Sequence, residues 1–236
     1  ASVISSAYSK SEPTGSPKAI LEILILKGFI LFMTAYLIGA LPTGLILTKL
    51  FLKQDVRKIG SGSTGATNVL RTVGKKAALI TLVCDILKGV VAIGIAIIIS
   101  KFDFYPNEYF AIITQLAGVA VVLGHIFPVY YGFKGGKGVL TSITVMFMIN
   151  WEISLICLLL FILIVAITKF VSLGSILAAF AFPCLVFFSD KIPFLTDRKD
   201  MLIFSIILAA IVIIKHRTNI VRLVQGKENK LSFKKK

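Results

Sequence analysis

Long apolar runs alternate with short polar segments along most of the chain. The runs cover roughly 28–51, 77–99, 108–124, 138–150, 152–168, 172–188 and 201–214, and residues 20–26 are also apolar. A membrane-spanning helix needs roughly 20 residues to cross the hydrocarbon core. The pattern therefore predicts an all-α integral membrane protein, because a soluble domain has no place for so many long apolar segments.

Residues 138–168 allow two interpretations. They can form one long tilted helix, or a tight hairpin that turns at Asn150, Trp151 and Glu152. Each half of the hairpin would be about 15 residues, or about 23 Å at the rise of an α-helix. That length is short against a hydrocarbon core of ~30 Å. Length alone does not decide between the two models.

Charge favours the hairpin. With it, segments 52–76, 125–137, 169–171 and 215–236 share one side of the membrane and carry seventeen Lys and Arg residues. The loops on the opposite side carry four: Lys101, Lys191, Arg198 and Lys199. Cytoplasmic segments are rich in Lys and Arg. We therefore expect seven transmembrane helices, with the N-terminus outside and the C-terminus in the cytoplasm.

Composition agrees with the membrane class. Hydrophobic residues make up 57% of the chain and mean hydropathy is +0.93, whereas soluble domains are usually about 45–50% apolar. The net charge of +15 lies in short segments between apolar runs. We assign it to membrane topology and to contact with anionic lipid head groups, so no nucleic acid partner is expected. Some of these cations remain available for an anionic substrate.

The folded part is expected to be one domain. Residues 1–19 are polar, rich in serine and without periodicity, which predicts a disordered extension or an expression remnant. Residues 20–230 are expected to form a single membrane domain, followed by a basic tail at 231–236.

Few ionisable or thiol groups lie inside the apolar runs. Asp85 and Lys88 are three residues apart in one of them, which favours a structural ion pair over a direct substrate role. The three cysteines are Cys84, Cys157 and Cys184, and they lack the spacing of a metal site or a disulfide framework. No metal is expected.

The first polar segment of interest reads GSGSTGATN over 60–68 and is followed by Arg71. Glycine lets backbone N–H groups turn toward an anion, as in phosphate-binding loops. Hydroxyl and amide side chains add donors, and an arginine matches phosphate geometry. The alternative is a flexible turn, which fits a short Gly/Ser-rich loop about equally well. The flanking cations favour the anion site: Arg57, Lys58, Arg71, Lys75 and Lys76.

The second segment contains His125 and the run KGGKG over 134–138. This run lacks the order of a Walker A loop, and no βαβ pattern surrounds it, so nucleotide hydrolysis is excluded. A glycine-rich turn with two lysines that opens a helix is still suited to phosphate. The alternative is that His125 packs at the interface and that the lysines reach toward the head groups.

The third segment, HRTNIVRLVQGKE over 216–228, directly follows the last apolar run. His216 and Asn219 are three residues apart, so they share a face of a continuing helix. The alternative is a basic tail that binds anionic lipid, which we prefer for Lys234, Lys235 and Lys236.

Together these segments closely resemble the PlsY family of bacterial acyl-phosphate:glycerol-3-phosphate acyltransferases. The resemblance rests on GSGSTGATNVLR, GHIFPVYYGFKGGKGV and HRTNIVRLVQGKE in this order, and it covers roughly residues 28–230. It implies seven helices with an external N-terminus at the bacterial inner membrane and a cytoplasmic active site. It also implies transfer of a fatty acyl group from acyl phosphate to glycerol 3-phosphate, without a cofactor, and a soluble partner, PlsX, that supplies acyl phosphate. Ser63 stands where the family commonly has asparagine.

The expected site combines the three segments. Side chains expected to act in catalysis are Ser61, Arg71, Lys137, His216 and Asn219. Expected substrate contacts are Gly60, Gly62, Ser63, Gly65, Thr67, Asn68, His125, Lys134, Gly135, Gly136 and Glu228. Seven spans return the C-terminal segment to the side of KGGKG, so Lys137, His216 and Asn219 should converge on one pocket. The proton acceptor stays open between His216, with an unperturbed pKa near 6.5, and the substrate phosphate, whose second pKa lies near 6.

Other functional classes fit less well. The H-x-x-x-x-D motif of the other major class of phospholipid acyltransferases is absent, because Tyr130 and Val221 stand five residues after the two histidines. A transporter or channel for phosphate or lipid would show broken helices and a binding site at mid-membrane. A membrane anchor would not require three glycine-rich polar segments.

Overall fold

The computed structural model describes residues 16–102 and 106–231, and every regular element in these ranges is a helix. The α-helices are α1 (Pro17–Gly39), α2 (Thr43–Leu52), α3 (Ala66–Thr72), α4 (Lys75–Lys101), α5 (Phe110–Ile126), α6 (Val139–Ile149), α7 (Trp151–Thr168), α8 (Val171–Phe187), α9 (Leu202–Lys215) and α10 (Arg217–Val224). Short 3₁₀ helices are η1 (Val56–Lys58), η2 (Asn107–Tyr109), η3 (Val129–Tyr131), η4 (Ser189–Lys191) and η5 (Lys199–Met201). The expected all-α class is confirmed for the described residues.

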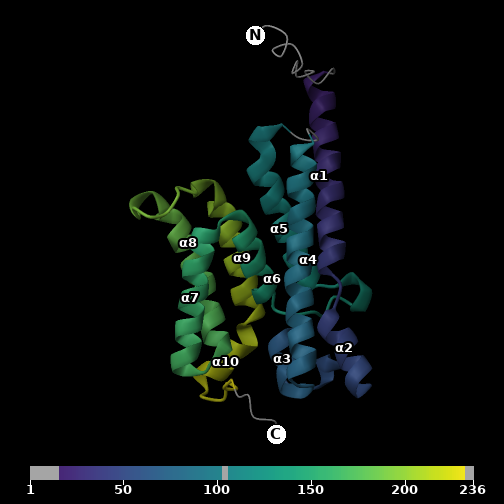
Figure 1. Ribbon diagram of the computed structural model, residues 1–236, viewed down its shortest axis with the longest axis vertical. Coiled ribbons are helices and arrows are strands. Elements are labelled where there is room, and N and C mark those ends of the chain that lie inside the picture. Colours follow the sequence, from purple (N-terminus) through teal and green to yellow (C-terminus); the bar gives the residue numbers. More distant parts are fainter. Residues whose placement is uncertain (1–15, 103–105, 232–236) are drawn as a thin grey trace, which may run out of the picture.

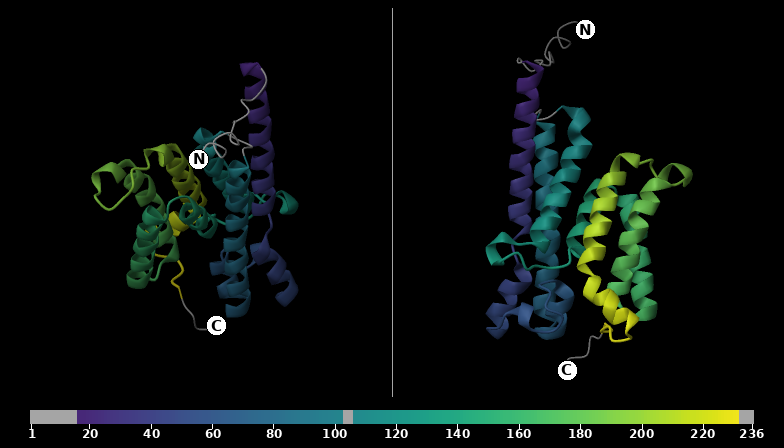
Figure 2. Two further views of the ribbon diagram at one scale, coloured as in Figure 1. Left: turned by 45° about the horizontal axis from the view of Figure 1, so that its top comes forward. Right: turned by 180° about the vertical axis from the view of Figure 1, so that it is seen from behind.

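The long helices form two groups joined by α6. Helices α1, α4 and α5 pack together, as do α7, α8 and α9, and α6 contacts α4, α5 and α7 (Figure 1). The short helices α2, α3 and α10 lie at the end of the molecule opposite the start of α1, and the views of Figure 2 show the same arrangement. The first polar segment leads into α3 and the third contains α10, whereas the second lies between α5 and α6.

Several helices have the length and apolar composition of membrane spans. Four candidate spans cover Leu21–Leu52, Lys75–Lys101, Phe110–Tyr131 and Trp151–Thr168, and the bent pair α9–α10 brings the number to five. Helices α6 and α8 are apolar but shorter. An integral membrane protein is thus supported, whereas a count of seven spans also requires the two shorter helices and stays a prediction.

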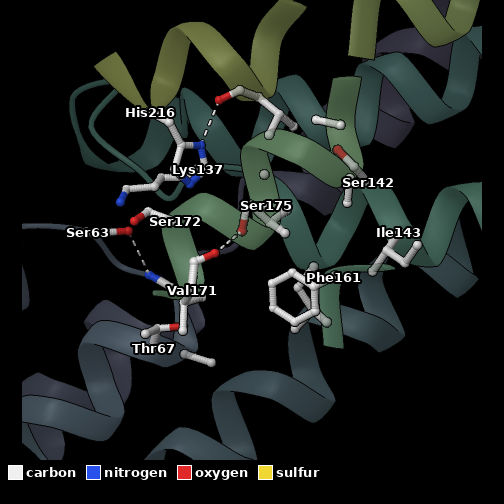
Figure 3. A pocket seen from close by; sticks show the side chains of 18 of the residues that line it. Ser63, Thr67, Lys137, Ser142, Ile143, Phe161, Val171, Ser172, Ser175 and His216 are labelled. Carbon is white, nitrogen blue, oxygen red and sulfur yellow. Dashed lines mark hydrogen bonds between the residues drawn. The ribbon is translucent and has the colours of Figure 1, made fainter. Parts of the chain in front are cut away.

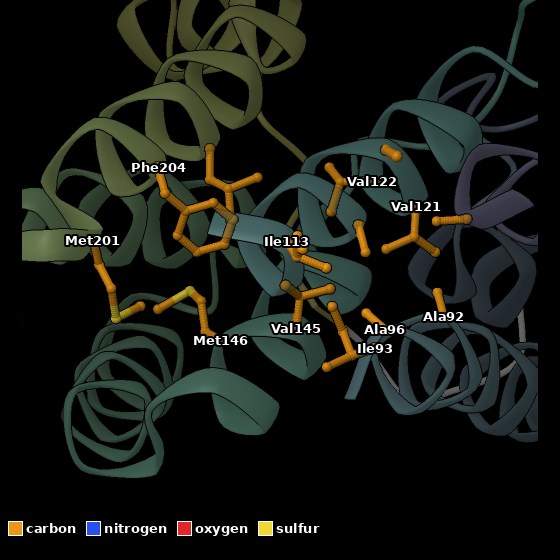
Figure 4. Close-up of a cluster of buried hydrophobic side chains, with 14 of the residues drawn as sticks. Ala92, Ile93, Ala96, Ile113, Val121, Val122, Val145, Met146, Met201 and Phe204 are labelled. Atoms are coloured by element: carbon orange, nitrogen blue, oxygen red, sulfur yellow. The ribbon is translucent and has the colours of Figure 1, made fainter. Parts of the chain in front are cut away.

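The core lies where the two helix groups meet. Ile93 of α4, Val121 of α5, Val145 of α6 and Phe204 of α9 are fully or almost fully buried in one cluster (Figure 4). On the outer faces large apolar side chains stay exposed, for example Ile203 at 75%. Such apolar outer faces suit hydrocarbon and not water, because transfer of apolar surface into water is unfavourable.

Glycines allow α1 and α5 to cross closely. A Cβ atom at Gly39 would overlap the carbonyl oxygen of Val121, and one at Gly124 would overlap that of Tyr36. Small residues let membrane helices approach each other in this way. The crossing holds the end of α5, and therefore His125, next to the end of α1.

The structure resolves the ambiguity over residues 138–168. Helix α6 ends at Ile149, and the side chain of Asn150 accepts a hydrogen bond from the N–H of Ile153, which caps the start of α7. Two helices are present, as the hairpin interpretation predicted. Glu152 accepts hydrogen bonds from the N–H and hydroxyl of Thr196, so this turn lies beside the 188–201 segment.

The four segments assigned to one side of the membrane lie together. Arg57 donates to the carbonyl of Tyr131 at 2.8 Å, and Arg71 donates to that of Asn229 at 3.2 Å. The N–H of Leu231 donates to the carbonyl of Lys169 at 2.7 Å. The charge argument therefore grouped the segments correctly. Which end faces the cytoplasm stays a prediction.

Two expected boundaries differ in the structure. The first apolar run, 28–51, is divided between α1 and α2 by a break at residues 40–42, because Pro42 supplies no N–H for a continuous helix. Helix α1 begins at Pro17, inside the segment expected to be disordered. The remainder of that extension, residues 1–15, and residues 232–236 of the basic tail lie outside the described residues.

The topology predicts where an introduced cysteine is accessible. In a variant with its three cysteines replaced, Glu152→Cys should react with an impermeant thiol reagent added to intact cells. Lys227→Cys, at the other end of the molecule, is the matched control and should react only after permeabilisation. The reverse pattern of labelling would contradict the expected orientation.

Candidate active site

A cavity of about 320 Å³ is lined by residues of both helix groups, and Figure 3 shows some of the side chains in its wall. One part of its wall carries polar side chains: Ser61, Arg71, Lys137, His216, Asn219 and Glu228. The remaining wall is mainly apolar and includes Ile143, Met146, Phe161, Phe182 and Leu208. The cavity thus offers charged groups and hydrocarbon-like surface to a single ligand.

Glu228 holds the C-terminal segment against α8 and α10. Its Oε1 accepts from Nδ2 of Asn219 at 2.8 Å and from Oγ of Ser172 at 3.1 Å, and its Oε2 accepts from Nε of Arg222 at 2.8 Å. Burial alone would raise the pKa of Glu228, but the bonds from Arg222, Asn219 and Ser172 lower it below its ordinary value. Glu228 is therefore an ionised acceptor near neutral pH.

Lys137 meets the same cluster from the other helix group. Its Nζ donates to Oδ1 of Asn219 at 2.6 Å, although the two residues are 82 positions apart. Burial lowers the pKa of Lys137 to about 8, against the opposing charge of Glu228. Lys137 is thus mostly charged at pH 7 and turns neutral as the pH rises through 8.

His216 lies at the bend between α9 and α10, which differ in direction by 58°. Its Nδ1–H donates to the carbonyl of Val212 at 2.8 Å (Figure 3), which fixes the ring and leaves Nε2 as the acceptor. Burial lowers the pKa of His216 to about 4, with Lys137 adding to the shift. The ring is neutral at pH 7, and it lines the cavity together with Lys137 and Asn219. The expected convergence of these three residues is confirmed.

The first loop is organised by Asn68. Its Oδ1 accepts from the N–H of Ser61 at 2.8 Å, and its Nδ2 lies within hydrogen-bonding distance of the carbonyls of Val56, Ile59 and Ser63. The amide is 2% exposed. All its polar atoms are thus used within the loop, so its position suits an organising role and leaves Ser61 at the cavity wall.

Arg71 faces the cavity from α3. Its Nη2 donates to the carbonyl of Asn229, and its buried Nε has no hydrogen-bond partner among the described residues. Burial lowers the pKa of Arg71, but an arginine stays charged near neutral pH. A buried guanidinium with an unused donor is suited to an anionic ligand.

The glycines of KGGKG serve the backbone of the second segment. The N–H of Gly135 donates to the carbonyl of Ile126 at 3.1 Å, and that of Gly136 donates to the carbonyl of His125 at 3.1 Å. A Cβ atom at Gly136 would overlap the His125 ring. These two glycines allow the 134–138 turn to pack closely against α5. This packing brings Lys137, in the same turn, close to Asn219.

A buried charged network supports this packing. Nζ of Lys88 lies 2.7 Å from Oδ1 of Asp85 and 2.7 Å from Nδ1 of His125. The hydroxyl of Thr43 donates to Oδ1 of Asp85 at 3.0 Å. The network joins α2, α4 and α5, and this geometry supports the structural interpretation of the Asp85–Lys88 pair.

The structure brings most of the expected site residues to the cavity. They are Ser61, Ser63, Gly65, Thr67, Asn68, Arg71, His125, Lys137, His216, Asn219 and Glu228. It does not bring Gly60, Gly62, Lys134, Gly135 or Gly136 to the cavity wall. Gly60 and Gly62 adopt positive φ angles of 60° and 72°, which a turn requires, and Lys134 is exposed.

Sequence reasoning missed Ser172, Arg222 and Ser142. Arg222 lay inside the third segment, and Ser172 directly follows the short 169–171 turn on the basic side, so position was a usable signal for both. Ser142 gave none, because nothing in the sequence distinguishes it from Thr141 and Thr144, the other hydroxyl residues of the same apolar run. Within the described ranges no group of three or more His, Cys, Asp or Glu residues could hold a metal ion.

The model of the glycerol-3-phosphate acyltransferase family matches residues 29–226. The chain belongs to this family. Members include proteins of that name from Prochlorococcus marinus (strain MIT 9215), 41% identical over 204 residues, and Clostridioides difficile (strain 630), 43% identical over 210 residues. These alignments cover 86% and 87% of this chain and 97% and 96% of the relatives.

Two solved structures of the family share the fold. One is PlsY, an integral membrane glycerol 3-phosphate acyltransferase, in its glycerol 3-phosphate form, with a TM-score of 0.73 and 34% identity. The other is the lysophosphatidic acid form, with a TM-score of 0.72 and 33% identity. The matches cover 87% and 88% of this chain and 96% of each solved chain. The sequence resemblance to the PlsY family is thus confirmed.

Proposed function

We propose that this protein transfers a fatty acyl group from acyl phosphate to glycerol 3-phosphate, which gives lysophosphatidic acid and phosphate. The observation that carries the proposal is the cavity, which joins a cluster of cations to a mainly apolar wall. Both substrates carry phosphate, and one also carries a long hydrocarbon chain. Membership of the glycerol-3-phosphate acyltransferase family supports the same reaction.

The polar wall suits two phosphate groups. Arg71 approaches it from α3 and Lys137 from the turn before α6, and Arg71 has a donor without a protein partner in the described chain. Ser61 adds a hydroxyl from the first loop. We assign phosphate binding to these three residues, because charge-assisted hydrogen bonds to phosphate are the stronger kind.

The apolar wall suits the acyl chain. Met146, Phe161, Phe182 and Leu208 are among the apolar side chains that line the cavity. Burial of hydrocarbon there contributes about 0.8 kcal/mol for each methylene group removed from water. The carbonyl carbon of the donor then lies where the polar and apolar walls meet.

Positioning and charge stabilisation are sufficient for this reaction. Acyl phosphate is a mixed anhydride, so phosphate leaves readily and no covalent intermediate is required. The hydroxyl oxygen of glycerol 3-phosphate forms a bond to the acyl carbon, and the bond from that carbon to the phosphate oxygen breaks. Lys137 stabilises the developing negative charge, and Asn219 keeps its ammonium in place.

The substrate phosphate is the better proton acceptor. With a pKa of about 4, His216 binds a proton more weakly than a phosphate whose second pKa is near 6. Nε2 of His216 still accepts a hydrogen bond, so it can orient the attacking hydroxyl. We assign proton transfer to the phosphate and orientation of the hydroxyl to His216.

The proposed setting is the inner membrane of a bacterium. Residues 20–230 would form one domain of seven spans, with the polar end of the cavity at the cytoplasm, where seventeen cations gather. Glycerol 3-phosphate would then enter from water, and lipid would surround the apolar outer faces. A soluble enzyme such as PlsX would deliver acyl phosphate.

The donor can be tested directly. Purified protein should convert palmitoyl phosphate and glycerol 3-phosphate to lysophosphatidic acid and phosphate, because the cavity and the cations fit that donor. Product formation from labelled glycerol 3-phosphate is the measurement. Palmitoyl-CoA is the control, and equal or faster turnover with it would overturn the assigned donor.

If the substrate phosphate is the proton acceptor, two variants of His216 should differ in activity. His216→Gln keeps a hydrogen-bonding group and should retain activity within about tenfold, whereas His216→Ala should lose ~10², because the attacking hydroxyl is no longer oriented. Wild-type kcat/KM should rise with pH through about 6, as the phosphate loses its proton. It should fall as the pH rises through about 8, because Lys137 becomes neutral.

Lys137→Arg provides a control for the alkaline limb. Arginine stays charged at high pH, so this variant should move the fall in activity to a higher pH. If His216→Gln is as inactive as His216→Ala, His216 is the base and the assignment to phosphate is wrong.

A further inference from the structure

Hydroxyl side chains in these helices usually bond back to their own helix. Thr144 of α6 donates to the carbonyl of Leu140 at 2.9 Å, and Ser175 of α8 donates to that of Val171 at 2.9 Å. The same contact, to a carbonyl four residues earlier, occurs at Thr34, Thr48, Thr72, Thr81, Ser100, Thr114, Ser154 and Thr168. A serine or threonine inside an apolar helix is normally satisfied in this way.

Ser142 differs from this pattern. It lies on α6 and is 5% exposed, yet its Oγ has no hydrogen-bond partner among the residues that the structure describes. Ser142 also lines the cavity and is one of the side chains drawn in Figure 3. A buried hydroxyl without a partner is unfavourable, because it has lost its bonds to water. Thr141 also has an unpartnered hydroxyl, but it does not line the cavity.

Ser142 lies between the polar and the apolar parts of the cavity wall. Its N–H donates to the carbonyl of Gly138 at 2.7 Å, so Ser142 lies one helical turn beyond the residue that follows Lys137. The other residues of α6 on this wall include Val139, Ile143 and Met146, all apolar. Ser142 is therefore a single polar group at the start of an apolar stripe.

We propose that the hydroxyl of Ser142 donates a hydrogen bond to the carbonyl oxygen of the acyl group during transfer. The proposal rests on the function proposed above. In acyl phosphate the carbonyl carbon lies between the phosphate, which needs cations, and the hydrocarbon chain, which needs an apolar wall. The carbonyl oxygen is the polar atom of the ligand that reaches this junction.

The bond gains strength in the transition state. When the glycerol hydroxyl attacks, the carbonyl oxygen takes up negative charge, and a donor in a buried site stabilises that charge. Ser142 keeps its own proton throughout. The bond from the acyl carbon to phosphate breaks, and the proton of the glycerol hydroxyl passes to the phosphate. Ser142 thus acts on the reacting atoms without forming a covalent bond.

The test separates a contact with the carbonyl from a role in the cavity wall. Ser142→Ala should lower kcat/KM for palmitoyl phosphate by about tenfold or more, less than the ~10²–10³ of a sole oxyanion donor, because Lys137 remains. Hexadecyl phosphate lacks the carbonyl but keeps the phosphate and the chain. Its inhibition constant should change by no more than about twofold, because it makes no bond to Ser142.

Thr144→Val is the matched control. It removes a buried hydroxyl from the same helix, but that hydroxyl bonds to Leu140 and does not line the cavity. This variant should keep wild-type activity.

Two results would overturn the assignment of Ser142 alone. The first is that Ser142→Ala keeps near wild-type activity. The second is that Ser142→Ala raises the inhibition constant of hexadecyl phosphate by as much as it lowers kcat/KM. A wild-type protein that does not use palmitoyl phosphate at all would overturn the proposed function together with this assignment.

Discussion

The carboxylate of Glu228 is the interaction on which the polar site depends. It accepts from Asn219, Ser172 and Arg222, and so ties the C-terminal segment to α8 and α10. With Nδ2 of Asn219 committed to Glu228, Oδ1 of the same amide turns toward Lys137. An asparagine amide has one acceptor end and one donor end. The carboxylate therefore determines which end of Asn219 faces the lysine.

Close helix packing brings Lys137 to this point. The 134–138 turn is held against α5 because the N–H groups of Gly135 and Gly136 bond to carbonyls of α5, and because Gly136 leaves room for the His125 ring. The ring in turn contacts Lys88, which is paired with Asp85. A buried ion pair is costly unless its members are well partnered. The lysine and amide of the proposed site are thus supported by two separate networks, one in each helix group.

The class of fold, the two-helix arrangement of 138–168 and the convergence of Lys137 with His216 and Asn219 were predictable from the sequence. The lengths of the apolar runs and the positions of Lys and Arg between them can be read from it directly. It did not predict how individual polar groups are used. A Gly-rich loop with an amide fits a ligand site and a self-bonded turn equally, and only the contacts show that Asn68 bonds within its loop. Ser142 and Ser172 carry no motif, because their roles depend on which helix faces them.

Glu228 acts on the site through Asn219. A double-mutant cycle measures this dependence, with Glu228→Ala, Asn219→Ala and the double variant compared by kcat/KM and checked for folding by thermal melting. If both residues serve one contact to Lys137, the double variant should lose no more than about threefold beyond the worse single variant, because residues that act as a unit are non-additive. Losses that multiply across the cycle would contradict the account and make Glu228 an independent contributor.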